Sequence, residues 1–127
     1  GREVAGVFDW DWASGQPRMV DVADGLLFFC GVRETPLLAG DIWSLTAAFG
    51  IDLQRVEHFL GGYASVLAPS AEERRCLPDL MRCRWLYCRA DAARRKVDPD
   101  RRVEFVTRDL MRPLQGIESI EAKLSGV

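Results

Sequence analysis

Histidines and closely paired cysteines, which build many protein metal sites, are scarce in this sequence. Its 127 residues include one histidine, His58, and four cysteines that form no C-x-x-C pair: Cys30, Cys76, Cys83 and Cys88. This pattern argues against a zinc site. It also argues against a disulfide framework and favours the reduced thiols of a cytoplasmic protein.

The sequence also lacks a long apolar stretch. The longest uninterrupted run covers residues 26–30, whereas a membrane-spanning helix needs about 20 apolar residues. Residues 1–4 have neither the basic start nor the apolar run of a signal peptide. We therefore predict a soluble, cytoplasmic protein. Because the first residue is not methionine, the sequence permits a chain that starts partway through a larger protein.

An excess of positive charge is absent as well. Seventeen Lys and Arg against nineteen Asp and Glu give a net charge of -2, which argues against nucleic acid or an anionic membrane as a partner. The basic clusters at residues 74–75 and 94–96 fit solvated helix faces or, alternatively, a phosphate-binding patch. With 48% hydrophobic and 28% charged residues, the composition is typical of a single globular domain over residues 1–127.

Hydrophobic periodicity predicts a mainly α fold. Residues 4–8 form a short β-prone run, and residues 13–17 have the composition of a turn. Apolar positions then recur at helical spacing over residues 20–30, 53–66 and 70–97, and over a last segment that reaches residue 124. Residues 33–50 mix proline and glycine with isolated apolar residues, which predicts a connecting segment with one short turn.

Local signals predict where several helices begin and break. Asp52 is a predicted N-cap, and Ser70 with Glu73 forms a predicted capping box. Proline inside a helix removes a backbone donor and crowds the preceding turn. Pro78 is therefore expected to kink or restart the long helix, and Pro113 to interrupt the last one. The predicted architecture is one N-terminal strand followed by four or five helices.

The most informative segment is the aspartate pair that follows the predicted strand. Asp9 and Asp11 flank Trp10, and alternation along an extended chain points both carboxylates to the same side. A strand that delivers carboxylates into a loop suits a divalent cation, which prefers oxygen ligands on a rigid backbone. The same spacing is also typical of a solvent-facing pair of acids.

Two blocks of the sequence follow a known family pattern. The first has A-G-V-F-D-W-D at residues 5–11, G-Q-P-R at 15–18 and V-D-V-A at 20–23. The second has F-L-G-G-Y-A-S-V at residues 59–66, S-A-E-E at 70–73 and L-P-D-L at 77–80. Both resemble the protein-kinase-like small-molecule phosphotransferases, the group of aminoglycoside phosphotransferase, homoserine kinase and choline kinase. The similarity is closest to the homoserine-kinase type and spans roughly residues 4 to 100.

This resemblance implies a fold and a set of roles. The chain corresponds to the helical C-terminal subdomain of the protein-kinase-like fold, with a metal-loop strand or hairpin and turn in residues 1–18 and helices in residues 19–127. Asp9 matches the aspartate that holds Mg²⁺ against the phosphates of ATP, and Asp11 matches a position that assists a second metal ion in some members. Asp21 matches an aspartate that supports the catalytic loop, and a role as a plain N-cap is compatible with this. Trp10 and Trp12 line the substrate pocket or cover the core.

The family's remaining machinery does not occur in this sequence. The catalytic loop H-G-D-x-x-x-x-N and the lysine and glycine-rich loop of the nucleotide-binding lobe are missing. The resemblance therefore implies a parent kinase that uses ATP and Mg²⁺ to phosphorylate a homoserine-, aminoglycoside- or choline-like hydroxyl. The chain alone is expected to be inactive, to bind neither cofactor, and to self-associate through the open edge of strand 4–8. The alternative is a non-catalytic helical interaction or dimerisation module with the same fold.

Overall fold

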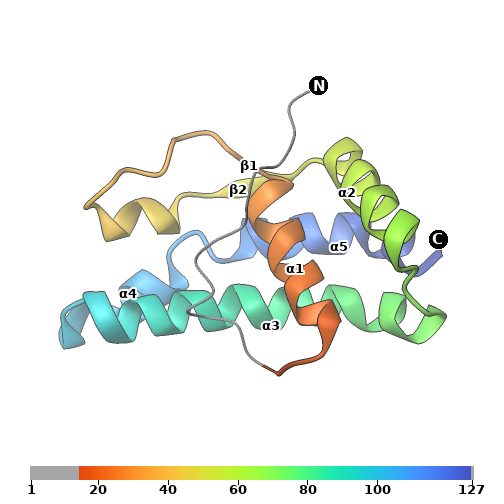
Figure 1. The fold of residues 1–127 in the computed structure, drawn as a ribbon. Coiled ribbons are helices and arrows are strands. Elements are labelled where there is room, and N and C mark those ends of the chain that lie inside the picture. The colour runs from red at the N-terminus through yellow and green to blue at the C-terminus, as the bar shows by residue number, and fades with distance from the viewer. Residues whose placement is uncertain (1–14, 127) are drawn as a thin grey trace, which may run out of the picture.

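The computed structural model describes residues 15–126, with side chains described through residue 124 (Figure 1). The described part is mainly helical, as predicted. Five α-helices, a two-stranded hairpin and two short 3-10 helices follow one another along the chain: α1 (Arg18–Phe29), β1 (Gly31–Arg33), η2 (Ile42–Thr46), β2 (Phe49–Ile51), α2 (Leu53–Val66), α3 (Ala71–Lys96), η3 (Pro99–Arg101), α4 (Arg102–Thr107) and α5 (Met111–Gly126).

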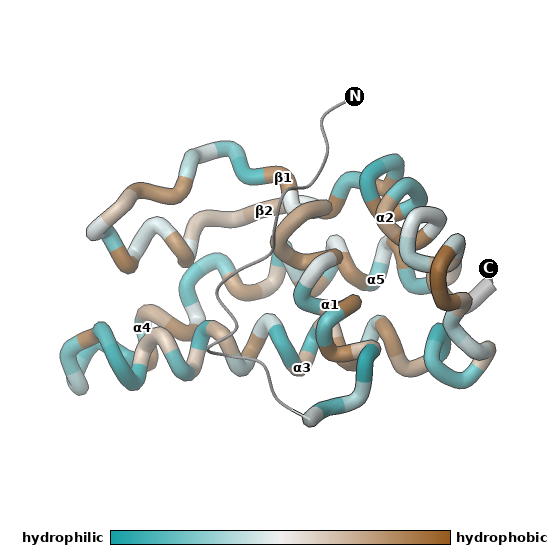
Figure 2. Tube along the Cα trace, in the orientation of Figure 1, coloured by the Kyte–Doolittle hydropathy of each residue, from teal (hydrophilic) through white to brown (hydrophobic). Residues whose placement is uncertain are grey.

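Helix α3 is the central element of the fold. Helices α1 and α5 both pack against it, and α4 packs near its C-terminal end (Figure 1). Apolar and hydrophilic residues alternate along α3, so that it buries one face rather than its whole circumference (Figure 2). The buried side chains of the main core come from α1, α3 and α5 in particular and include Val22, Leu26, Leu77, Met81, Trp85, Ile117 and Leu124.

The N-terminus of α3 forms the predicted capping box. The backbone N–H of Glu73 donates to the Ser70 hydroxyl at 3.2 Å, and the backbone N–H of Ser70 donates to the Glu73 carboxylate at 2.7 Å. The prediction that the helix restarts at Pro78 is wrong, because α3 runs continuously from Ala71 to Lys96. The Pro78 ring is buried in the core, and this packing compensates for the lost backbone hydrogen bond.

The hairpin was not predicted from the sequence. Its antiparallel strands pair Gly31 with Ile51 and Arg33 with Phe49, at the two ends of the stretch 33–50 that was expected to be a connection. Strand β2 packs against α5, and the Phe49 ring meets Trp85 of α3 edge to face, with ring centroids 4.9 Å apart. The hairpin therefore closes one side of the core with strands of only three residues each.

The last helical segment breaks earlier than predicted. The interruption falls between α4 and α5, where Asp109 adopts a positive φ of 48°. Pro113, the expected breaker, lies buried in the first turn of α5. A proline is tolerated there because the first N–H groups of a helix have no acceptor within the helix.

Candidate functional site

Several of the predicted site residues lie outside the described residues. These are the metal-ligand candidates Asp9 and Asp11, the pocket candidates Trp10 and Trp12, and the strand at residues 4–8. Their roles remain predictions. The described chain begins at residue 15, and its first element is α1.

Asp21 lies in the first turn of α1, and its side chain is exposed. The N-cap interpretation is wrong, because the helix begins at Arg18 and Pro17 occupies the cap position. Asp21 instead accepts a hydrogen bond from the side-chain amide of Gln16 at 3.1 Å. Its carboxylate is well placed to interact with the positive end of the helix dipole. Its role in supporting a catalytic loop remains a prediction.

Arg18 ties the start of α1 to the start of α3. Its Nε and Nη2 donate to the two carboxylate oxygens of Glu73, at 2.7 and 2.6 Å. Its guanidinium also lies 5.9 Å from the centre of the Tyr63 ring, and it donates to the backbone carbonyl of Ala68 at 3.3 Å. Because the guanidinium contacts both carboxylate oxygens, this ion pair fixes the distance between the two side chains and also their relative orientation.

The same contacts control the ionisation of Glu73. Hydrogen bonds from the Arg18 guanidinium and from the Ser70 backbone N–H lower the pKa of the Glu73 carboxyl to about 2. Glu73 is therefore ionised at neutral pH. The junction of Arg18, Tyr63 and Glu73 links the two sequence blocks at residues 5–23 and 59–80.

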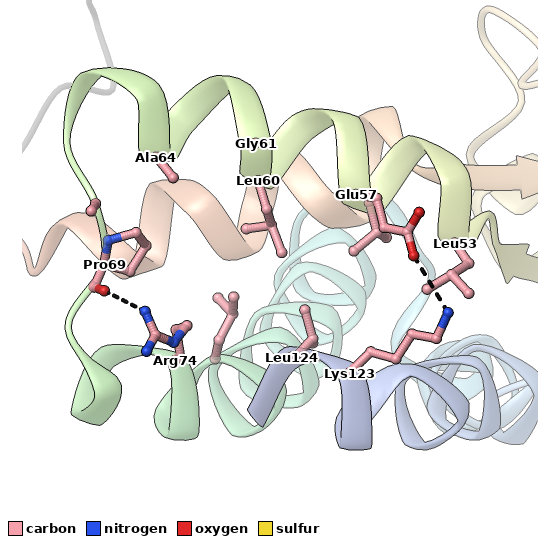
Figure 3. Close-up of a pocket in the computed structure, with 12 residues that line it drawn as sticks. Leu53, Glu57, Leu60, Gly61, Ala64, Pro69, Arg74, Lys123 and Leu124 are labelled. Carbon is pink, nitrogen blue, oxygen red and sulfur yellow. Dashed lines mark hydrogen bonds and ion pairs between the residues drawn. The ribbon is translucent and has the colours of Figure 1, made fainter. Parts of the chain in front are cut away.

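A groove of about 440 Å³ lies between α2 on one side and α3 and α5 on the other (Figure 3). Leu60 of α2 and Leu124 of α5 point toward one another across it (Figure 3). Its walls are mostly apolar, with contributions from Leu53, Val56, Leu60, Gly61, Ala64, Leu77 and Leu124. At one end the Lys123 ammonium pairs with Glu57 at 3.4 Å. At the other end Arg74 Nη1 donates to the Pro69 carbonyl at 2.8 Å.

On another side, α2 packs closely against α1. Phe59 of α2 lies directly over Gly25 of α1, where a Cβ atom would come within 2.4 Å of the ring. Along α2, Val56 is buried, whereas Val66 at the far end is 88% exposed. Leu60, Gly61 and Ala64 of α2 line the groove, in which Leu60 packs partly against the core and a Cβ atom at Gly61 would meet nothing within 4 Å. Small residues next to a leucine on one helix face are the sequence signal for this gap.

The described side chains contain no metal centre. Among residues 15–124, no three His, Cys, Asp or Glu side chains gather closely enough to hold a metal ion. No helix among the described elements has the length and apolar character needed to cross a membrane. Comparison of the chain with protein-family models, curated proteins and solved structures finds no match.

Proposed function

We propose that the chain is the C-terminal helical part of an ATP- and Mg²⁺-dependent kinase that phosphorylates a hydroxyl of a small molecule. The acceptor is homoserine-, aminoglycoside- or choline-like. The observation that carries this proposal is the Arg18–Glu73 ion pair, which joins the two family-like blocks across 55 positions of sequence. The mainly helical fold is consistent with it.

In this proposal the described residues supply a rigid base for the metal loop. Helix α1 is held to α3 by the Arg18–Glu73 pair and by its buried core face. The segment that carries Asp9 and Asp11 leads directly into α1 through residues 15–17. Bound Mg²⁺ would neutralise charge on the phosphates of ATP, so that positioning and electrostatics lower the barrier. The proton-accepting base and the nucleotide lobe would come from residues that precede Gly1.

The coding sequence that precedes Gly1 gives the first test. An H-G-D-x-x-x-x-N motif encoded shortly upstream would support the kinase. A start codon directly before Gly1 would instead support the interaction module. In a protein that contains the motif, we expect ATP-dependent phosphorylation of at least one alcohol from a panel of amino-acid, aminoglycoside and amino-alcohol acceptors.

The role of Asp9 has its own test in that longer protein. We expect Asp9→Asn to reduce turnover by far more than tenfold, because the metal ligand acts on the transition state. The matched control is Asp100→Asn, an exposed aspartate of η3, which should leave turnover unchanged. A tenfold effect corresponds to only about 1.4 kcal/mol of barrier height. If Asp9→Asn stays within that limit, Asp9 is not the metal ligand.

The groove between α2, α3 and α5 favours a second candidate, the non-catalytic interaction module. Apolar grooves between helices are common docking places for ligands and for partner helices. Under this alternative the chain has no phosphotransfer activity in any longer form, and binding at the groove is its function. Phosphotransfer by the longer protein that is lost in Asp9→Asn would decide for the kinase.

A further inference from the structure

Arg74 is an unusual residue to find in the wall of an apolar groove. Its Nη1 donates to the Pro69 carbonyl, but its Nε is buried and has no hydrogen-bond partner among the described residues. No carboxylate in the described part of the chain pairs with it. Other arginines of α3 do have such partners, since Arg82 binds Asp79 and Glu121, and Arg84 binds Asp24.

A buried donor without an acceptor calls for an explanation. Nearly all buried polar groups in proteins are hydrogen-bonded, and one left unpaired destabilises the structure. At the other end of the groove, Lys123 already pairs with Glu57. Among the residues that line the groove, Arg74 is thus a cation with no carboxylate partner in the described part of the chain, and it lies beside walls of leucine and valine. This combination complements an elongated apolar molecule with a single negative charge at one end.

The size of the groove fits a small molecule. Its volume of about 440 Å³ lies within the usual range for small-molecule pockets, about 300 to 1,000 Å³. Such pockets combine mostly apolar walls with a few polar groups that orient the ligand. Leu60, Leu77 and Leu124 provide the apolar walls here, and Arg74 provides the polar group. We propose that this groove binds an apolar monocarboxylate, such as a medium-chain fatty acid, with the carboxylate at Arg74 and the hydrocarbon chain along the three leucines.

This proposal does not rest on the proposed kinase function. It concerns a different part of the molecule from the predicted metal loop, and its tests measure binding alone. The probes are hexanoate, octanoate and decanoate, titrated below the concentration at which they form micelles. Binding to the 127-residue chain is followed by calorimetry and by shifts in the NMR signals of the groove residues. Because each buried methylene strengthens binding by about fourfold, affinity should rise about sixteenfold at each step of the series.

Variants of Arg74 test the position of the carboxylate. Arg74→Met should weaken decanoate binding at least tenfold and change decanol binding by less than threefold, because only the acid uses the cation. Arg75→Met is the matched control, since Arg75 is the next residue of the same helix, is exposed and does not line the groove. Equal losses for decanoate and decanol in Arg74→Met would overturn the assignment of the carboxylate to this residue.

Two adjacent glycines of α2 test the position of the hydrocarbon chain. A Cβ atom on either Gly61 or Gly62 would meet nothing within 4 Å, and of the two only Gly61 lines the groove. Gly61→Leu should therefore fill the groove and abolish decanoate binding, whereas Gly62→Leu should leave binding unchanged. Both variants replace a helical glycine and should fold, because leucine is the better helix former.

Three further outcomes would overturn the proposal. The first is decanoate binding that Gly61→Leu does not reduce, which would place the ligand elsewhere. The second is affinity that does not depend on chain length, which would show an adventitious surface contact. The third is a wild-type dimer that decanoate does not affect, together with a monomeric Gly61→Leu variant. That result would identify a second copy of the chain as the occupant of the groove.

Discussion

Helices α1 and α2 are in close contact at Gly25, where there is no room for a larger side chain. A Cβ atom there would lie 2.4 Å from Cζ and 2.9 Å from Cε2 of Phe59. These are atoms of a rigid ring, which itself lies 6.4 Å from the ring of Phe29. A larger residue at position 25 therefore requires the Phe59 ring to move or α2 to shift away from α1.

We predict that Gly25→Ala destabilises the protein by about 1 to 2 kcal/mol. Overpacking of this kind costs about 1 to 3 kcal/mol, and the better helix propensity of alanine offsets up to about 1 kcal/mol. Denaturant unfolding followed by circular dichroism gives the free energy. Gly62→Ala is the control, because open space surrounds that position and the variant should be as stable as wild type or more so. A stabilising effect of Gly25→Ala would show that α2 is not held against α1 by this contact.

Glu73 gives a prediction on pH. Its folded-state pKa of about 2 lies below the ordinary value, so the folded state favours the ionised carboxylate. The stability that follows is fully present above about pH 5 and is lost as the pH falls from there toward 2. Glu73→Gln should therefore be less stable than wild type at pH 7, and the difference should shrink steadily as the pH approaches 2.

The matched control for this experiment is Glu72→Gln. Glu72 lies in the same first turn of α3 but outside the Arg18 pair and the capping box. Its variant should keep the wild-type pH profile, apart from a small change in the interaction with the helix dipole. The assignment fails if the stability difference between wild type and Glu73→Gln is the same at pH 3 and pH 7.

Arg89 joins α3 to the end of α4. Its side chain is 2% exposed, and its Nη2 donates to the carbonyls of Phe105, Val106 and Arg108. The last carbonyls of a helix lack intrahelical donors, and a cation also complements the negative end of the helix dipole. Burial lowers the pKa of Arg89 to about 10, so its guanidinium stays charged at neutral pH.

We expect Arg89→Met to destabilise the protein by at least about 3 kcal/mol, because several buried carbonyls lose their donor together. Arg89→Lys should recover less than half of this loss, since an ammonium does not reproduce the planar fork of the guanidinium. Thermal and denaturant unfolding measure both variants. Arg101→Met is the comparison, because Arg101 pairs with Glu104 on the surface, where such pairs contribute at most about 1 kcal/mol. An Arg89→Met loss as small as this would contradict the role given to Arg89.

The sequence predicted correctly those features whose signals lie within a few neighbouring residues, such as the helix N-caps. Asp52 caps α2 by accepting from the Arg55 backbone N–H at 3.1 Å, and Ser70 begins α3, both as expected. The hairpin was missed because three-residue strands are too short to show alternation. Arg89 gave no signal either, since an arginine in a helix normally marks an exposed position and its partners lie in other elements.

The candidate site was less predictable than the fold. The sequence indicated that α2 has an apolar face, but not which part of that face would be left lining a groove. The close approach of Phe59 to Gly25 was not predictable either, because it brings together residues of two different helices. The sequence also did not predict that Arg74 Nε is buried and unpaired, because its surroundings are formed by α2, α3 and the turn at Pro69 together.

Two surfaces of the chain are candidates for association with a second copy. The sequence predicts that residues 4–8 form a strand with a free edge, and such edges pair readily with another strand. The groove between α2, α3 and α5 is a second apolar surface. The two surfaces lead to different dimers, because one uses backbone hydrogen bonds and the other uses side-chain packing.

We predict that the chain dimerises at tens of micromolar through residues 4–8, paired edge to edge with a second copy. Sedimentation velocity should show a dimer for wild type and a monomer for Val7→Pro, because proline lacks the N–H that a paired strand donates. Val103→Lys removes an exposed apolar side chain of α4 and should leave the dimer intact. A monomeric wild type contradicts the prediction. A dimer that survives Val7→Pro but not Gly61→Leu assigns the association to the groove, because only the second change fills the space between Leu60 and Leu124.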